Sequence, residues 1–185
     1  MSLITVLLMT CLSLLFFTAY NFFCVGKFGV QTSLSKTAYK LDEIKPHLCI
    51  WFSLTLGLMG ATLLPAWLVL SEGLTFQFLT FLSVVGIFFV AATPHFLEKQ
   101  EGTVHRIGAF LAAGAGLAWC FIYSPIWWVV FIYLGVCVGL ALLTKSIKCV
   151  EYWLEMIAFY TIYTCVIHLT FNQSMLEYIC NNALL

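Results

Sequence analysis

The sequence predicts an all-α integral membrane protein, a single bundle of six transmembrane helices over residues 1–185 with both termini outside. The first observation behind this prediction is composition, since 63% of the residues are hydrophobic and only 9% are charged. A soluble domain carries roughly 25% charged residues, so lipid must be the solvent for most of this surface. The second observation is a series of six apolar segments, each close to the roughly 20 residues that a spanning helix needs.

The third observation is that every lysine and arginine falls in alternate connections between these segments. Short loops rich in Lys and Arg stay in the cytoplasm, because translocating cations is unfavourable. The connections after the first, third and fifth segments are therefore predicted to be cytoplasmic. Their basic residues are Lys27, Lys36, Lys40 and Lys45, then Lys99 and Arg106, then Lys145 and Lys148.

The six helices are predicted at 3–25, 48–70, 75–92, 105–123, 126–143 and 149–171. The first is a retained helix and not a cleaved signal peptide, because no cation precedes it and Lys27 follows it. Pro65 should kink the second helix, since proline cannot donate a backbone hydrogen bond. Pro94 ends the third helix. Ser124-Pro125 forms the turn before the fifth, with Ser124 as its N-cap.

Small residues are spaced by four on two of these helices. Gly108, Ala112 and Gly116 lie on the fourth segment from the N-terminus, and Gly135 and Gly139 on the next. Such faces let helix backbones approach closely. Packing within the bundle is favoured, and homo-oligomerisation through Gly135 and Gly139 is the alternative.

The tryptophans are predicted to lie in the head-group layers, where amphipathic rings are enriched. Each falls near an end of a predicted helix and none at its middle. Trp51 and Trp153 are near inner ends, and Trp67, Trp119, Trp127 and Trp128 near outer ends.

Composition also excludes several classes of function. The formal net charge is zero, and no basic stripe remains for nucleic acid. The eight cysteines show no CxxC spacing, which argues against a zinc finger or a disulfide framework. The partner that composition does imply is the lipid bilayer.

The second inner connection carries the residues best suited to bind a metal. His95, His105 and Glu101 are the candidates, because imidazole and carboxylate both bind zinc or iron. The connection has no HExxH pattern, and Gly102 is expected to break a helix there. A polar turn that faces water is the alternative. Whether a metal or another cofactor binds is left open.

The last predicted helix carries a polar stripe. With the small residue Ala158 included, its members recur every three or four residues. They therefore share one face, which should turn to the bundle interior or to a water-filled cavity. Arg106 and Lys148 are the cations proposed as partners for Glu155. The stripe consists of Glu151, Glu155, Thr161, Cys165, His168 and Asn172.

Three segments of the chain carry a resemblance to known proteins, namely Val30–Tyr39 (VQTSLSKTAY), Leu64–Leu68 (LPAWL) and Val90–Phe96 (VAATPHF) followed by Glu101–His105 (EGTVH). These segments resemble a family of small membrane proteins from gut bacteria and their crAss-like bacteriophages. The sequence departs from the family at Gln31, where proline is common, and at Ala38, where an aromatic residue is common. The resemblance implies a phage-encoded or bacterial membrane protein and assigns no activity. It singles out Ser33, Ser35, Thr37, Glu101 and His105 as candidate functional residues.

A looser similarity links the chain to the ceramidase-like membrane hydrolases, which hold zinc with Ser, Asp and His residues. Six predicted helices in place of seven, and no HxxxH pair, mean that no ligand is carried over.

Three hypotheses about function follow. The favoured one is a non-catalytic, envelope-associated binding protein of the bacterial inner membrane. The second is a metal-dependent membrane hydrolase with a cytoplasm-facing His/Glu site, for which Glu101, His105 and Ser35 are the catalytic candidates. The third is a small transporter or channel, motivated by the polar stripe and by Pro65.

Overall fold

The computed structural model describes residues 2–92, 94 and 98–182, and the side chains of these residues except those of 98–102 and 174–182. This part of the chain contains helices and turns and no strand, so the prediction of an all-α fold is confirmed. The helices are α1 (Leu3–Phe28), α2 (Lys36–Ile44), α3 (Ile50–Leu70), α4 (Phe78–Ala92), α5 (Glu98–Phe110), the π-helical turn η2 (Leu111–Ala115), α6 (Gly116–Tyr123), α7 (Val129–Leu143) and α8 (Val150–Asn182).

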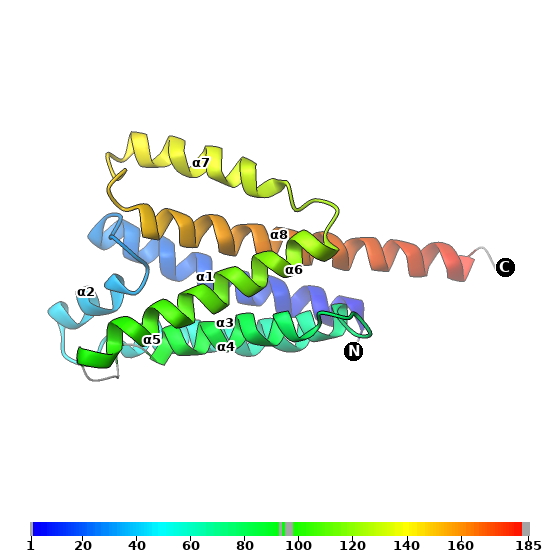
Figure 1. Cartoon of the computed structure of the whole chain (residues 1–185), viewed down its shortest axis with the longest axis horizontal. Coiled ribbons are helices and arrows are strands. Elements are labelled where there is room, and N and C mark those ends of the chain that lie inside the picture. The colour runs from blue at the N-terminus through cyan, green and yellow to red at the C-terminus, as the bar shows by residue number, and fades with distance from the viewer. Residues whose placement is uncertain (1, 93, 95–97, 183–185) are drawn as a thin grey trace.

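The long helices run alternately up and down between two ends of one bundle (Figure 1). The last turn of α1, all of α2, the start of α5 and the connection from α7 to α8 lie at the same end. We call this the basic end, because these segments carry the lysines and arginines. The start of α1, the connections α3–α4 and α6–α7, and the last turns of α8 lie at the opposite end.

Four helical stretches of the described chain are long and apolar enough to cross a membrane, namely Leu3–Phe28, Ile50–Leu70, Thr103–Tyr123 and Val150–Gln173. These four support a membrane-embedded protein. The apolar helices α4 and α7 have only 15 residues each, fewer than the roughly 20 of a full span. Both begin three residues later than predicted, because hydrogen-bonded turns such as Thr80 N to Gln77 O and Val129 N to Ile126 O precede them.

The fourth predicted helix differs from the structure at its start and in its middle. It begins at Glu98 and not at His105, and the expectation that Gly102 breaks the helix is wrong. The single π-helical turn η2 interrupts it at Leu111–Ala115. Such turns often lie near functional sites in proteins.

The bundle core contains large aromatic side chains. Trp67 and Trp119 have no exposed surface and stack edge to face, with ring centroids 5.3 Å apart. These two rings pack against one another between α3 and α6 and do not face lipid, while their depth in a head-group layer stays a prediction. In contrast, Trp51, Trp127 and Trp128 are exposed.

A buried hydrogen-bond network joins three of the long helices. Ser13 Oγ of α1 lies 2.6 Å from Tyr163 Oη of α8 and donates to the Met59 carbonyl of α3 at 2.8 Å. All three residues are almost fully buried. Interhelical hydrogen bonds of this kind fix the relative positions of helices where lipid offers no alternative partner.

Candidate polar site at the basic end

The connection from α1 to α2 folds back over the bundle and docks on the first turns of α8. Gly29 ends α1 with φ +69°, a conformation that favours glycine and that turns the chain. The Tyr152 N–H then donates to the Thr32 carbonyl at 3.0 Å. The first N–H groups of a helix have no partner within the helix, so this contact satisfies one of them and holds the connection in place.

Glu155 makes the shortest contact between this connection and α8. Its Oε2 atom accepts a hydrogen bond from the Leu34 N–H at 2.7 Å, and Leu34 is almost fully buried. The sequence suggested Arg106 or Lys148 as the partner of this carboxylate. That pairing stays a prediction. The structure shows a backbone donor from a distant loop at this carboxylate, and Arg106 lies nearby in the groove described below.

Two serines flank Leu34 and connect it to α5. Ser33 Oγ lies 3.0 Å from Ser35 Oγ, which lies 3.4 Å from His105 Nε2. Ser33 is 3% exposed and Ser35 is 5% exposed. The structure thus brings together Ser35 and His105, two of the three catalytic candidates from the sequence.

Thr37 extends this polar cluster toward α1. Its Oγ1 atom donates to the Leu34 carbonyl at 2.6 Å and lies 2.7 Å from Tyr20 Oη. Ser33, Ser35, Thr37 and His105, which the family resemblance singled out, therefore belong to one local arrangement. Tyr20 was not predicted, because an isolated tyrosine in an apolar helix gives no pattern.

A groove of about 290 Å³ runs beside this cluster, between α5, η2 and α8. Arg106, Glu151 and Leu154 are exposed, so the groove opens at the side of the bundle. One part of its wall is ionisable and the other is apolar. The wall consists of His105, Arg106, Glu151 and Glu155 together with Ala109, Ala113 and Leu154.

A small internal void of about 20 Å³ lies behind Glu155. Leu34, Ala109 and Phe159 are among its mostly apolar lining residues. A void of this size has room for about one water molecule. Glu155, Ala109 and Ala113 line both this void and the groove, so the two spaces adjoin at these residues.

The predicted metal site stays a prediction. His95 and the side chain of Glu101 lie outside the described residues, and among the described side chains no three His, Cys, Asp or Glu residues are grouped to hold a metal ion. Asp42, a residue type that the ceramidase-like hydrolases use, has a structural contact. Its Oδ1 atom accepts from the Cys49 N–H at 2.7 Å, at the start of α3.

The members of the polar stripe on α8 have different environments. Thr161 and Cys165 face the bundle interior and are almost fully buried. Glu151 and Asn172 are exposed near the two ends of the stripe, and Asn172 Nδ2 lies 3.4 Å from the His168 ring. Only Glu151 and Glu155 line the groove at the basic end.

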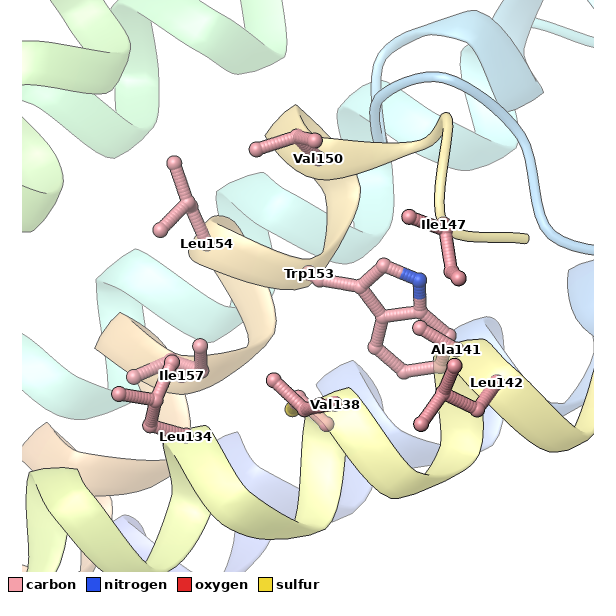
Figure 2. Close-up of a pocket in the computed structure, with 10 residues that line it drawn as sticks. Leu134, Val138, Ala141, Leu142, Ile147, Val150, Trp153, Leu154 and Ile157 are labelled. Carbon is pink, nitrogen blue, oxygen red and sulfur yellow. The ribbon is translucent and has the colours of Figure 1, made fainter. Parts of the chain in front are cut away.

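A second hollow, of about 230 Å³, separates α7 from α8 and is apolar (Figure 2). Trp153 points into it between Val138 and Ala141 of α7 and Ile147. Its indole N–H donates to the Ser146 carbonyl at 3.3 Å. No charged side chain is among the described residues of its wall, so little in this hollow would distinguish one apolar ligand from another.

The self-association face proposed for α7 also stays a prediction. A Cβ atom placed on Gly135 or Gly139 would meet nothing within 4 Å, so these glycines lie against open space.

No known protein family, curated protein or solved structure matches this chain. The resemblance to membrane proteins of gut bacteria and their phages therefore stays a prediction, and function is inferred from the geometry of the site.

Proposed function

We propose that this chain is a multi-pass membrane protein that binds an amphipathic lipid, without transforming it, in the groove between α5, η2 and α8. The observation that carries the proposal is the mixed wall of that groove. One open space is lined by the guanidinium of Arg106 and the imidazole of His105, by two carboxylates and by an apolar strip. Ligand sites combine mostly apolar walls with a few placed polar groups in this way.

The proposal includes six membrane crossings with the basic end in the cytoplasm, in a bacterial inner membrane. The grouping of lysines and arginines at one end supports this orientation. A helix of 15 residues is about 22 Å long, shorter than the ~30 Å hydrocarbon core. Apolar residues in the turns before α4 and α7, such as Phe76 and Trp128, extend both helices toward the opposite surface.

The groups on the wall match a zwitterionic head group. Arg106 and His105 suit a phosphate, because guanidinium and imidazole N–H groups donate to its oxygens. The exposed Glu151 suits an ammonium group, which donates to carboxylates, whereas Glu155 already accepts from the Leu34 N–H. Ala109, Ala113 and Leu154 leave an apolar strip for the start of an acyl chain. An aminophospholipid offers all three features.

Native mass spectrometry of the detergent-purified protein tests this function with phosphatidylethanolamine and phosphatidylcholine. Only the ethanolamine amine donates hydrogen bonds, and one charge-assisted bond is worth about 1.5–3 kcal/mol. We expect the wild type to prefer phosphatidylethanolamine at least about tenfold. Glu151→Gln should remove this preference, whereas Glu72→Gln, an exposed carboxylate at the opposite end, should keep it. Equal binding of the two lipids by the wild type would refute the proposal.

A second candidate function is lipid hydrolysis with Ser35 as nucleophile and His105 as base. The 3.4 Å separation of Ser35 Oγ and His105 Nε2 favours it, since such pairs are often loose before substrate binds. Against it, Ser35 is 5% exposed and does not line the groove. A fluorophosphonate probe decides between the two. If the probe labels the wild type and Ser33→Ala but not Ser35→Ala, Ser35 is an activated nucleophile and the hydrolase function is supported. If the probe labels none of these proteins, lipid binding is the function supported.

A further inference from the structure

A third hollow, which the proposed function does not use, lies on the other side of the basic end. It is a groove of about 400 Å³ between α1, α2 and α3. Its walls are apolar except for Lys27 at one end and the hydroxyl-bearing Tyr20 and Thr55. The other lining residues are Phe16, Ala19, Phe23, Leu41, Ile44, Leu48 and Trp51.

The length of this groove matches one leaflet of a bilayer. From Phe16 to Lys27 the α1 wall rises through 11 residue steps, which is about 16 Å at the helical rise per residue. Half of the hydrocarbon core is about 15 Å thick. If Lys27 lies at the head-group layer, Phe16 therefore lies near the middle of the membrane.

The short helix α2 closes one side of the groove. It is held by the 2.7 Å contact between Thr37 Oγ1 and Tyr20 Oη, and Leu41 packs inward while Ile44 stays exposed. Trp51 and Phe23, both more than half exposed, stand on the walls contributed by α3 and α1. The groove is therefore an apolar channel along the side of the bundle and not a solvated cleft.

The charge at its end determines which lipid fits. Among the described residues that line this groove, Lys27 alone is charged, and it is exposed in the last turn of α1. The nearby Lys40 is paired with Glu43 at 2.7 Å. We propose that this groove holds one acyl chain of an anionic phospholipid whose phosphate is bound by Lys27. This site is separate from the aminophospholipid groove and depends only on the protein being embedded in a membrane.

Fluorescence of Trp51 tests this site in the full-length protein. The protein is reconstituted in phosphatidylcholine vesicles that contain a low fraction of brominated phosphatidylglycerol or brominated phosphatidylcholine. The fluorescence of Trp51 is obtained by subtracting the emission of the Trp51→Phe variant from that of the wild type. Bromine quenches tryptophan fluorescence only at close range, so we expect quenching of Trp51 that saturates as the brominated lipid fills the groove. One basic residue at a membrane surface contributes about 1 kcal/mol to binding of an anionic lipid, which corresponds to about a fivefold preference for brominated phosphatidylglycerol.

Three variants decide the origin of that preference. Lys27→Gln should reduce the preference to about one, whereas Lys148→Gln, an exposed lysine at the same end but off the groove wall, should leave it at about fivefold. Ala19→Leu, which fills the groove without changing charge, should reduce quenching by both lipids. Equal quenching of the wild type by both lipids, or equal losses in the two lysine variants, would overturn the proposal. These quenching results do not depend on whether phosphatidylethanolamine binds at Glu151, so the two proposals can fail separately.

Discussion

Glu155 illustrates how one carboxylate can organise a site inside an apolar helix. Its carboxylate accepts a hydrogen bond from the N–H of Leu34, and this bond holds the α1–α2 connection against α8. Because Leu34 lies between Ser33 and Ser35, this bond also sets the distance from Ser35 to His105 on α5. Glu155 thus acts mainly by positioning the loop, while Glu151, one turn earlier on the same helix, is exposed to the groove.

Removing the Glu155 carboxylate should destabilise the protein. In Glu155→Ala the buried Leu34 N–H loses its acceptor, which costs about 1–3 kcal/mol of unfolding free energy. Glu151→Ala is the matched control, and as an exposed position it should change stability by at most about 0.5 kcal/mol. Denaturation of the detergent-purified variants measures the change in unfolding free energy for each of them. Glu155→Gln, which keeps an acceptor oxygen, should lose less than Glu155→Ala. Equal losses for the two alanine variants would contradict this role of Glu155.

The residue types of the site could be predicted from the sequence, but their pairing could not. Serines, a histidine and an intramembrane glutamate are recognisable because they are rare in apolar segments. The partner of Glu155 could not be found this way, since the pattern of side chains says nothing about which backbone N–H a folded loop presents. The metal candidates His95 and Glu101 were chosen by residue type alone, and their side chains are not among those described.

At the scale of helices, a close backbone contact joins α4 to α5 and η2. A Cβ atom on Gly86 would overlap the Ala112 nitrogen and the Gly108 carbonyl oxygen. Ser83 Oγ also donates to the Ala112 carbonyl at 2.6 Å. The spacing of Gly108 and Ala112 predicted a close approach, but it did not identify the partner helix or the π-helical turn, which depends on how the two backbones meet.

Gly86→Ala should therefore destabilise the bundle, by roughly 1–3 kcal/mol as overpacked cores do. Gly135→Ala on α7 is the control, because its Cβ atom would meet nothing within 4 Å. There the better helix propensity of alanine should leave stability unchanged or raise it by up to about 1 kcal/mol. Thermal unfolding monitored by intrinsic fluorescence compares the two variants. A destabilised Gly135→Ala would reveal a contact of α7 with another molecule.

Helix ends were the least predictable elements. Gly102 was expected to break a helix, yet α5 runs through it, since one interior glycine costs only about 1 kcal/mol relative to alanine. The starts of α4 and α7 were placed too early because apolar turn residues look like helix in a hydropathy profile. The burial of Trp67 and Trp119 could not be predicted either, because a sequence position near a helix end does not tell a lipid-facing ring from a core ring.

For the whole molecule, the all-α fold followed directly from composition and from the lengths of the apolar segments. The number of crossings follows less directly, because α4 and α7 are short. The lengths of the helices alone leave two limiting topologies, with six crossings or with four. If α4 and α7 also cross, the α6–α7 turn lies outside. If neither crosses, that turn lies in the cytoplasm, and the start of α5, with Lys99 and Arg106, lies outside. This arrangement goes against the usual distribution of basic residues and against the structure, in which the start of α5 and the last turn of α1 lie at the same end.

A biotin acceptor peptide inserted between Ser124 and Pro125 of the full-length chain distinguishes these topologies, because biotin ligase acts only in the cytoplasm of the expressing bacterium. With six crossings we expect no biotinylation there. The same insertion between Lys145 and Ser146 should be biotinylated under either topology, so it controls for expression and for access of the ligase. Biotinylation at Ser124 would exclude the six-helix arrangement. It would also place Arg106 on the outer side, and the proposed lipid groove would then face the outer leaflet.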